Sequence, residues 1–483
     1  MNSGLAVGSW LVAPNEWLQA LQWFFLSYFI LLNGGYILLN LLSLISLRSY
    51  IDRHSLDHLP YAYTGFDPPI SLLVPAYNEE ATIAASLRSL LQLDYPEFEI
   101  VVINDGSKDG TLAELTREFA LLPFPEAYWR RLPCQEVRGI YRSTRHANLR
   151  VIDKANGGKA DALNAGINAS RHALFCAVDA DSILQRDALA RVVQPFVEDP
   201  CTIATGGTIR IANGCKISGG FLVEVGLPRN LLARFQVIEY LRAFLFGRLG
   251  WSPLNAVLIV SGAFGLFKKS EVIDAGGYRA DTVGEDMELI VRLHRINRLR
   301  GTPYRITYVP DPICWTEAPE TLKVLRSQRT RWQRGLAESL TLNWPLLFHP
   351  RSGPVGWLAF PFFILFEFLG PLIEVLGYAL MIVGTIFGLF SWEAFKTFMF
   401  VALSFGILLS VTALLLEELS FRLYSRPAQT AWLLVAAIVE NFGYRQLVAL
   451  WRLQGLLRWM VGARQRWGEM TRADTLRSDR TSP

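Results

Sequence analysis

Residues 173–182 read ALFCAVDADS, a short apolar run that ends in two aspartates separated by one residue. The fold class follows from this segment, because two others along the chain have the same form. Residues 70–79 read ISLLVPAYNE, residues 99–107 read EIVVINDGS, and a helical pattern follows each of them. Strands that alternate with helices predict an α/β domain with a mostly parallel sheet, covered by helices on both faces.

The polar residues that follow these apolar runs predict a ligand site. Parallel strands bring their carboxyl ends to one edge of the sheet, where ligands bind in folds of this kind. The side chains expected at that edge are Tyr77, Asn78, Glu79, Asp105, Asp179 and Asp181. So many acceptors indicate a pocket for a hydroxyl-rich ligand that carries a metal ion.

Two common nucleotide-binding motifs do not occur. A dinucleotide-binding turn requires G-x-G-x-x-G, and no predicted strand is followed by it. A P-loop requires Ser or Thr after Gly-Lys, whereas Gly157-Gly158-Lys159 is followed by Ala160. The sequence therefore points away from both of these nucleotide folds.

Asp179 and Asp181 are candidate metal ligands. A D-x-D pair on a turn can direct both carboxylates at one divalent cation, which prefers oxygen ligands and takes others from substrate phosphates. Aspartates at strand ends also cap helices and form turns, so the pair alone leaves both interpretations open.

Two later segments carry further candidate side chains. Residues 283–289, VGEDMEL, begin a helix with three acidic residues, which either serve chemistry or complement the helix dipole. Residues 328–335, QRTRWQRG, combine three arginines with a tryptophan. They form either a solvated basic helix face or a diphosphate grip beside an aromatic surface for a sugar.

The composition excludes a wholly soluble protein. Of 483 residues, 51% are hydrophobic and 19% are charged, and the mean hydropathy is +0.25. Soluble domains carry about 25% charged residues. The net charge of +4 gives no general affinity for nucleic acid, and five scattered cysteines without a C-x-x-C pair argue against disulfides and structural zinc.

The apolar residues concentrate outside the α/β part. Residues 17–47 contain no charge and are long enough for a transmembrane helix. A secretory signal is disfavoured because no Lys or Arg precedes Arg48. The positive charges that follow the segment place residue 50 onward in the cytoplasm, so we expect a cytoplasmic catalytic domain over residues 61–342.

A second apolar region, residues 357–448, predicts two to three membrane segments. Residues 357–390 contain Pro361 and Pro371, which indicates a re-entrant piece followed by a span, or one kinked helix. Residues 398–416 and 431–448 are further candidate spans, and residues 449–483 predict a basic amphipathic tail on the membrane surface.

Two carboxylates in this region, Glu367 and Glu374, are seven residues apart. Carboxylates within a membrane are costly and suggest a functional site. They either line a polysaccharide path or are hydrogen-bonded inside the helix bundle.

Taken in order, the motifs resemble a known family. They are VPAYNEE at 74–80, NDGS at 104–107, GKADALN at 158–164, the Asp179/Asp181 pair, Glu285-Asp286, and Q-x-x-R-W at 328–332. This set resembles the family 2 glycosyltransferases, and among them the membrane-embedded synthases of cellulose, chitin, hyaluronan and poly-N-acetylglucosamine. The resemblance covers about residues 70–335 and implies a single glycosyltransferase A-type nucleotide-binding domain flanked by transmembrane helices.

The resemblance also implies roles for individual residues. On the donor side, Tyr77 and Glu79 hold the nucleoside, Asp105 reads the uracil edge, Asp179 faces the donor, and Lys159, Gln328 and Arg331 contact the diphosphate. Asp181, with Asp179, holds Mg²⁺ or Mn²⁺. Asp286, beside Glu285, is the general base, and Trp332 is the platform under the acceptor sugar. Gly284 replaces the threonine of the T-E-D sequence that is frequent in the family, so that hydroxyl is lost.

Two segments look like acceptor-side structure. Ser261 and Gly262, expected on a strand, match the position where these synthases line the acceptor terminus, although a tight strand crossing explains the glycines equally well. Residues 229–248 form either an amphipathic helix at the membrane interface or part of the core.

The implied activity is transfer from a UDP-sugar, best UDP-N-acetylglucosamine, to a growing β-linked polysaccharide, coupled to translocation. One base without a second nucleophilic carboxylate favours inversion, although two-step retaining chemistry stays open. The implied location is the bacterial inner membrane, with lipids and export proteins as partners. Two alternatives are transfer of one sugar to a polyprenyl-phosphate or glycolipid, and a non-catalytic membrane receptor with a degenerate transferase domain.

Overall fold

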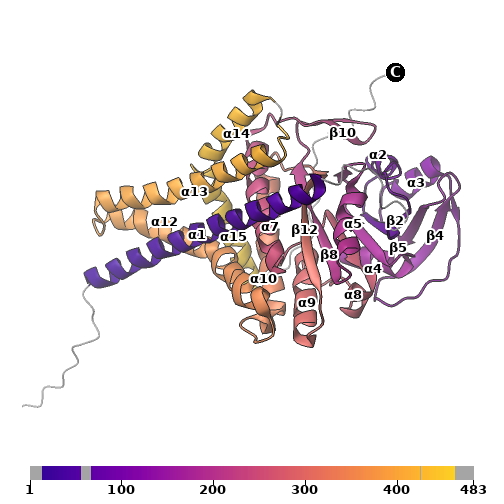
Figure 1. Cartoon of the computed structure of the whole chain (residues 1–483), viewed down its shortest axis with the longest axis horizontal. Helices are drawn as coiled ribbons and strands as arrows, with labels where there is room; N and C mark the ends of the chain where they lie inside the picture. Colours follow the sequence, from indigo (N-terminus) through magenta and orange to yellow (C-terminus); the bar gives the residue numbers. More distant parts are fainter. Residues whose placement is uncertain (1–13, 56–66, 425, 463–483) are drawn as a thin grey trace, which may run out of the picture.

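The computed structural model describes residues 14–55, 67–424 and 426–462. The first residues of the predicted catalytic domain, 61–66, and the end of the predicted tail, 463–483, lie outside the described residues. Within the described chain, a sheet domain packs against a group of long helices, as Figure 1 shows.

The sheet domain is built on a ten-stranded sheet in the order β3-β4-β5-β2-β1-β6-β11-β8-β12-β7. Its centre is parallel: β1 (Ile70–Ala76) pairs with β2 (Phe98–Asp105) and β6 (Leu174–Val178), and β2 pairs with β5 (Leu149–Lys154). The sheet is mixed, because β11 (Phe264–Lys268) runs antiparallel to both β6 and β8 (Thr202–Ile211). The predicted α/β fold is confirmed.

The remaining strands extend this sheet. The long β12 (Arg305–Thr316) lies parallel to β8, and antiparallel strands complete the two edges. These edge strands are β3 (Leu121–Pro123), β4 (Val137–Ser143) and β7 (Ile183–Leu184), and β9 (Lys216–Ser218) with β10 (Phe221–Glu224) forms a separate hairpin.

Helices follow the strands and cover the sheet. They are α2 (Ile83–Leu90), α3 (Thr111–Phe119), α4 (Lys159–Ala169), α5 (Ala188–Glu198), α8 (Lys269–Asp274), α9 (Glu285–Arg300) and α10 (Leu322–Leu342). The central strands are apolar on both faces, with Ile70, Leu72 and Val102 fully buried. Burial on both faces is the reason why these runs are continuously hydrophobic rather than alternating.

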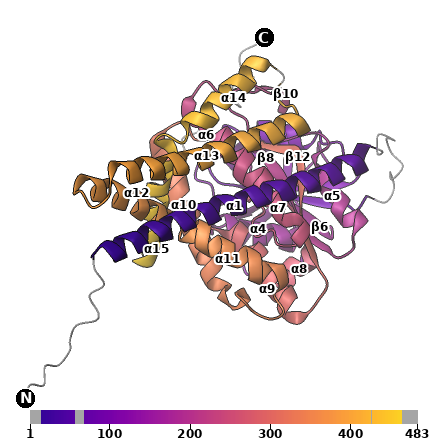
Figure 2. The same ribbon diagram turned by 60° about the vertical axis from the view of Figure 1, so that its left-hand side comes forward.

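The membrane helices lie to one side of the sheet domain. The first, α1 (Pro14–Ser55), is apolar over Gln19–Ile51, and α13 (Trp392–Ser420) is the second helix long and apolar enough to cross a membrane. In Figures 1 and 2, α1, α12 and α13 extend together beyond the sheet domain. The apolar segments expected at 17–47 and 398–416 thus fall within single long helices.

The other predicted membrane segments are bent pairs. Val355–Phe368 meets α12 (Gly370–Ile386) at 43°, close to Pro371, and this bend fits both the kinked helix and the re-entrant piece expected there. The candidate span 431–448 is not one helix: α14 (Pro427–Val439) and α15 (Tyr444–Met460) meet at 58°, with Gly443 at φ 108° between them. A positive φ is strained for other residues, so Gly443 permits this bend.

Helix α15 contains the first residues of the predicted basic tail, 449–460. It packs along α10 of the sheet domain, and its contact with a membrane surface stays a prediction. Gly455 lies against the Thr330 carbonyl, and Arg452 donates to Gln333 at 2.8 Å. Since small residues permit close helix approach, Gly455 sets this contact.

The segment 229–248 lies between the two parts of the molecule. It forms α6 (Leu231–Tyr240), a π-helical turn over Leu241–Phe246 and α7 (Gly247–Trp251). These pieces pack against α1, α13 and α14 on one side and contact β8 on the other. Phe235 and Phe246 are buried there, so the core interpretation of this segment is correct for these side chains.

Candidate active site

The predicted site residues come from six places around the carboxyl edge of the central strands. Tyr77 and Glu79 follow β1, Asp105 ends β2, and Asp179 and Asp181 follow β6. Lys159 begins α4, Glu285 and Asp286 begin α9, and the segment Gln328–Trp332 belongs to α10. The parallel topology is what gathers residues so distant in sequence.

Lys159 is the centre of the site. Its ammonium pairs with Asp179 and donates to the Gly262 carbonyl at 3.0 Å. Burial disfavours the charged form of Lys159, but the carboxylates of Asp179, Glu285 and Asp286 outweigh it and raise the pKa of the lysine. Lys159 therefore stays positively charged between the predicted donor and acceptor sides.

Gly262 connects the lysine to the predicted base. Its backbone N–H donates to Asp286 Oδ2 at 2.8 Å. A Cβ atom at this position would lie 3.1 Å from Lys159 Nζ and 3.2 Å from Asp286 Oδ2, so only glycine fits without a shift. The prediction that Ser261 and Gly262 lie on a strand is wrong: they lie in the turn that leads into β11, since the Phe264 N–H bonds back to the Ser261 carbonyl at 3.2 Å.

Glu285 is buried beside this group. The pKa of Glu285 is raised to about 7, because burial and the neighbouring Asp286 raise it by more than Lys159 and Arg331 lower it. The positive charge of Arg331 thus acts on the start of α9, and its contact with a diphosphate stays a prediction.

The structure explains why glycine stands at position 284, where the family frequently has threonine. A Cβ atom at Gly284 would lie 2.8 Å from the Cα of Gly335, and one at Gly335 would lie 2.9 Å from the Cα of Gly284. The start of α9 and the middle of α10 therefore meet backbone to backbone. A threonine in place of Gly284 would not fit this approach.

Asp105 is more enclosed than its predicted uracil contact implies. Its carboxylate pairs with Lys154 and accepts the N–H groups of Gly157 at 3.0 Å and Gly158 at 2.7 Å. The side chain is 3% exposed. Asp105 thus holds the turn that presents Lys159, and its contact with uracil stays a prediction.

The predicted nucleoside loop is held by hydrogen bonds to the loop after β2 and to the start of α2. Asn78 adopts the left-handed region at φ 56°, and its amide oxygen accepts the Lys108 N–H at 2.8 Å. The Glu79 carboxylate accepts the Thr82 hydroxyl at 2.6 Å. Tyr77 is 43% exposed, so its ring is accessible for stacking.

In α10, the structure adds Arg329, which the sequence did not single out. Trp332 packs near Phe244, with ring centres 5.9 Å apart, and the guanidinium of Arg329 lies 4.3 Å from the centre of its indole. Arg329 is 2% exposed. The motif contains three arginines, and the sequence does not indicate which of them is buried.

The two carboxylates of the D-x-D pair can hold a divalent ion only together with further ligands from a bound substrate. Within residues 14–55, 67–424 and 426–462, no group of three or more His, Cys, Asp or Glu side chains could hold a metal. Asp179 and Asp181 supply two oxygen-donor side chains, and Asp179 is shared with Lys159. This donor set suits a hard ion that takes other ligands from a diphosphate.

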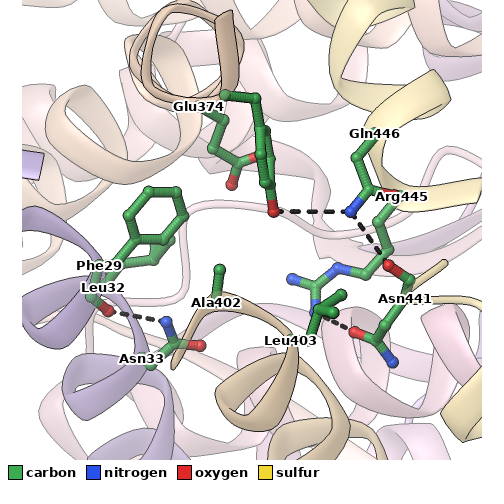
Figure 3. A pocket seen from close by; sticks show the side chains of 10 residues that line it. Phe29, Leu32, Asn33, Glu374, Ala402, Leu403, Asn441, Arg445 and Gln446 are labelled. Atoms are coloured by element: carbon green, nitrogen blue, oxygen red, sulfur yellow. Dashed lines mark hydrogen bonds between the residues drawn. The ribbon is translucent and has the colours of Figure 1, made fainter. Parts of the chain in front are cut away.

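A polar cavity lies among the membrane helices (Figure 3). It is lined by Phe29, Leu32, Asn33, Glu374, Tyr378, Ala402, Leu403, Asn441, Arg445 and Gln446. The Glu374 carboxylate points into it, and Arg445 donates to Asn441 at 3.0 Å on its opposite wall. Glu367 is different: it pairs with Arg452 at 2.7 Å and accepts the Tyr36 hydroxyl. Glu367 is therefore paired and hydrogen-bonded inside the helix bundle, whereas Glu374 lines a cavity, and passage of a polysaccharide beside it stays a prediction.

Fold and site together define an α/β domain with an acidic, lysine-centred site at its sheet edge, attached to membrane-type helices. Two family models match this domain: Glycosyl transferase family 2 over residues 71–130 and Glycosyltransferase like family 2 over residues 133–335. Together they cover more than half of the chain, which belongs to the family 2 glycosyltransferases.

Curated relatives are similar over the same region. The chain is 35% identical over 291 residues to a poly-beta-1,6-N-acetyl-D-glucosamine synthase of Staphylococcus aureus and 32% identical over 280 residues to that of Staphylococcus epidermidis. These matches cover 60% and 58% of this chain, but only 59% and 57% of the relatives' own lengths.

Among solved structures, a mannosyltransferase from Pyrobaculum calidifontis in complex with GDP-Man and Mn²⁺ aligns over 86% of this chain and 99% of its own. Its TM-score is 0.49 and its sequence identity is 20%. Such a likeness does not bear on the substrate.

Proposed function

We propose that this chain transfers N-acetylglucosamine from UDP-N-acetylglucosamine to the end of a growing β-linked polysaccharide. The observation that carries the proposal is the junction of Lys159, Asp179, Gly262 and Asp286 at the sheet edge. It brings a cation for a diphosphate next to a carboxylate suited to accept a proton. The similarity to poly-beta-1,6-N-acetyl-D-glucosamine synthases supports the choice of sugar.

On the donor side, the residues stabilise the charge of the leaving group. Lys159, Gln328 and Arg331 bind the diphosphate, and Tyr77 and Glu79 hold the nucleoside. Asp179 and Asp181 would hold Mg²⁺ or Mn²⁺, which neutralises charge on the leaving diphosphate when it is bound. Arg331 and Lys159 add fixed positive charge at the same place.

On the acceptor side, Asp286 accepts the proton of the attacking hydroxyl. The Gly262 N–H fixes one oxygen of Asp286, and a positioned base of this kind contributes roughly 10²–10⁴ in rate. Trp332 supports the acceptor sugar from α10. A single displacement inverts the anomeric centre, so an α-linked donor gives a β-linkage.

We extend the proposal to translocation of the product. The cavity between α1, α12, α13 and the α14–α15 bend offers carboxylate, guanidinium and amide groups among the apolar helices. Such groups are costly in lipid and suited to the hydroxyl and amide groups of a sugar chain. The positive charges at the end of α1, Arg48 and Arg53, support a cytoplasmic catalytic domain at the inner membrane, with lipids and export proteins as partners.

The test is synthesis by the purified protein in detergent, with UDP-N-acetylglucosamine and Mg²⁺ or Mn²⁺. UDP release and product size are measured for the wild type, for Asp286→Asn and for the control Asp281→Asn, whose carboxylate is exposed and pairs with Arg279. We expect a long polymer from the wild type and the control, and none from Asp286→Asn.

Other outcomes contradict parts of the proposal. A short or lipid-linked product would indicate transfer of a single sugar. Equal activity of Asp286→Asn and wild type would remove Asp286 as the base, and inactivity with every UDP-sugar would favour a receptor.

A further inference from the structure

We propose that Arg329 is a positioning residue that fixes Gln328 and Trp332 together and ties both to the helices at the membrane side. This inference rests on the proposed function, because Gln328 and Trp332 are assigned there to donor and acceptor. Arg329 itself contacts neither substrate in this proposal.

Arg329 holds the two site residues by two different interactions. Its Nη1 donates to the Gln328 amide oxygen at 3.0 Å. Its guanidinium lies 4.3 Å from the centre of the Trp332 indole, within the range of a cation–π contact. One planar cation thus orients an amide and an aromatic ring on the same turn of α10.

The orientation of Gln328 matters for its predicted role. An amide offers one acceptor end and one donor end, and a diphosphate requires the donor. Because Arg329 occupies the oxygen of Gln328, the amide nitrogen is the end directed to an anionic ligand. Loss of Arg329 would permit the amide to turn over and to present its oxygen to the phosphates.

The orientation of Trp332 follows the same logic. Arg329 covers one face of the indole, and Phe244 packs against it at an interplanar angle of 53°. Phe244 is in turn stacked on Tyr240, with ring centres 4.2 Å apart. These contacts fix the plane of the indole, and its half-buried ring is the surface that we assign to the acceptor sugar.

Arg329 is anchored outside α10. Its Nη2 pairs with Glu239 of α6 at 2.8 Å, and the same Glu239 oxygen accepts the Tyr444 hydroxyl of α15 at 3.0 Å. Both α6 and α15 border the membrane helices. A buried guanidinium is stable only when it is paired, so the position of Arg329 depends on both helices.

The test compares Arg329→Lys with Arg326→Lys. Lysine keeps the charge at position 329 but lacks the planar fork that contacts three partners at once. Arg326 is the matched control, since it lies on the same helix, is exposed and bonds Gln454 of α15. We expect Arg329→Lys to raise the KM for UDP-N-acetylglucosamine roughly tenfold and to shorten the polymer, while Arg326→Lys changes neither.

Two further variants separate positioning from folding. Glu239→Gln keeps the shape of the anchor and removes its charge, so we expect a smaller rise in KM and a smaller loss of polymer length than in Arg329→Lys. The double variant Arg329→Lys/Glu239→Gln should be no worse than Arg329→Lys alone, because the two residues act as one unit. Unchanged KM and product length in Arg329→Lys would overturn the proposal, and so would a fall in kcat alone.

A readout that does not depend on activity keeps the two proposals apart. The protein is labelled with 5-fluorotryptophan, and the ¹⁹F signal of Trp332 is assigned by its loss in Trp332→Phe. We expect this signal to shift in Arg329→Lys and to stay in place in Arg326→Lys. If the wild type makes no product but the signal shifts in Arg329→Lys, the positioning role is supported and the proposed function is contradicted. An unmoved signal in Arg329→Lys would refute the positioning role.

Discussion

At the scale of single residues, Gly262 shows how little space the site leaves. Gly262→Ala would place a methyl group 3.1 Å from Lys159 Nζ and 3.2 Å from Asp286 Oδ2, so one of them must move by a few tenths of an ångström. Displacements of about 1 Å cost roughly 10² in rate. We expect kcat to fall about tenfold or more, measured as UDP release, with little change in the unfolding temperature.

The control for this substitution is Gly34→Ala on α1, where a Cβ would meet nothing within 4 Å. We expect Gly34→Ala to retain wild-type kcat. Wild-type kcat in Gly262→Ala would show that Asp286 need not be held by the turn before β11.

Glu285 predicts a dependence of stability on pH. Burial and Asp286 raise its pKa to about 7, from about 4.3 in an unfolded chain. The folded protein therefore binds more protons than the unfolded one between these values. This contribution to stability is full below pH 4 and is lost as the pH rises through 7, with a slope of up to about 1.4 kcal/mol per pH unit.

The measurement is the apparent unfolding temperature between pH 5 and pH 8 for the wild type and for Glu285→Gln. Glutamine does not ionise, so we expect the unfolding temperature of the variant to fall less between pH 5 and pH 8 than that of the wild type. Parallel curves for the two proteins would mean that Glu285 is ionised throughout this range.

At the scale of elements, the site depends on the approach of α9 to α10. Gly284→Thr, which restores the residue that is frequent in the family, would bring its Cβ within 2.8 Å of the Gly335 Cα. Overpacking of this kind costs about 1–3 kcal/mol. We expect a lower unfolding temperature and reduced UDP release, because the threonine separates Asp286 from Trp332. A Gly284→Thr protein with wild-type stability and activity would contradict this packing argument.

The strands and their polar ends could be predicted from the sequence because the signal is local. In ALFCAVDADS, the apolar run, the turn and the two carboxylates are adjacent, and the same holds for the ends of β1 and β2. Contacts between distant segments leave no local pattern. The pairing of Arg329 with Glu239, the packing of α15 on α10 and the antiparallel β11 in the middle of the sheet depend on tertiary structure.

The apolar segments expected at 17–47 and 398–416 coincide with single helices, whereas the segment expected at 431–448 bends. Gln19–Ile51 and Trp392–Ser420 are each long and apolar enough to cross a membrane, and 431–448 is divided by the turn at Gly443. Composition records the mean hydropathy of such a segment but not the direction of its axis. Hence apolar length alone could not distinguish a continuous span from a bent pair.

At the scale of the whole molecule, ion pairs join the sheet domain to the membrane helices. Gln333 of α10 bonds Arg452 of α15, and Arg452 pairs with Glu367 near the end of the segment Val355–Phe368. Arg210 of β8 pairs with Glu417 of α13 at 2.6 Å in a buried position. The Arg210–Glu417 pair holds the sheet domain at a fixed place relative to α13, since breaking a buried pair costs about 3–5 kcal/mol.

This arrangement yields a prediction about transport rather than chemistry. Glu374 points into the membrane cavity and lies outside the sheet domain, so Glu374→Gln should leave sugar transfer intact while altering the passage of the chain. In vesicles with the sheet domain outward, we expect unchanged UDP release at early times and at least a severalfold loss of polymer protected from an added hydrolase. The matched control is Glu393→Gln at the start of α13, where the carboxylate is exposed. If Glu374→Gln and Glu393→Gln protect as much polymer as the wild type, the cavity is not on the path, and the sugar chain must leave the site between other helices.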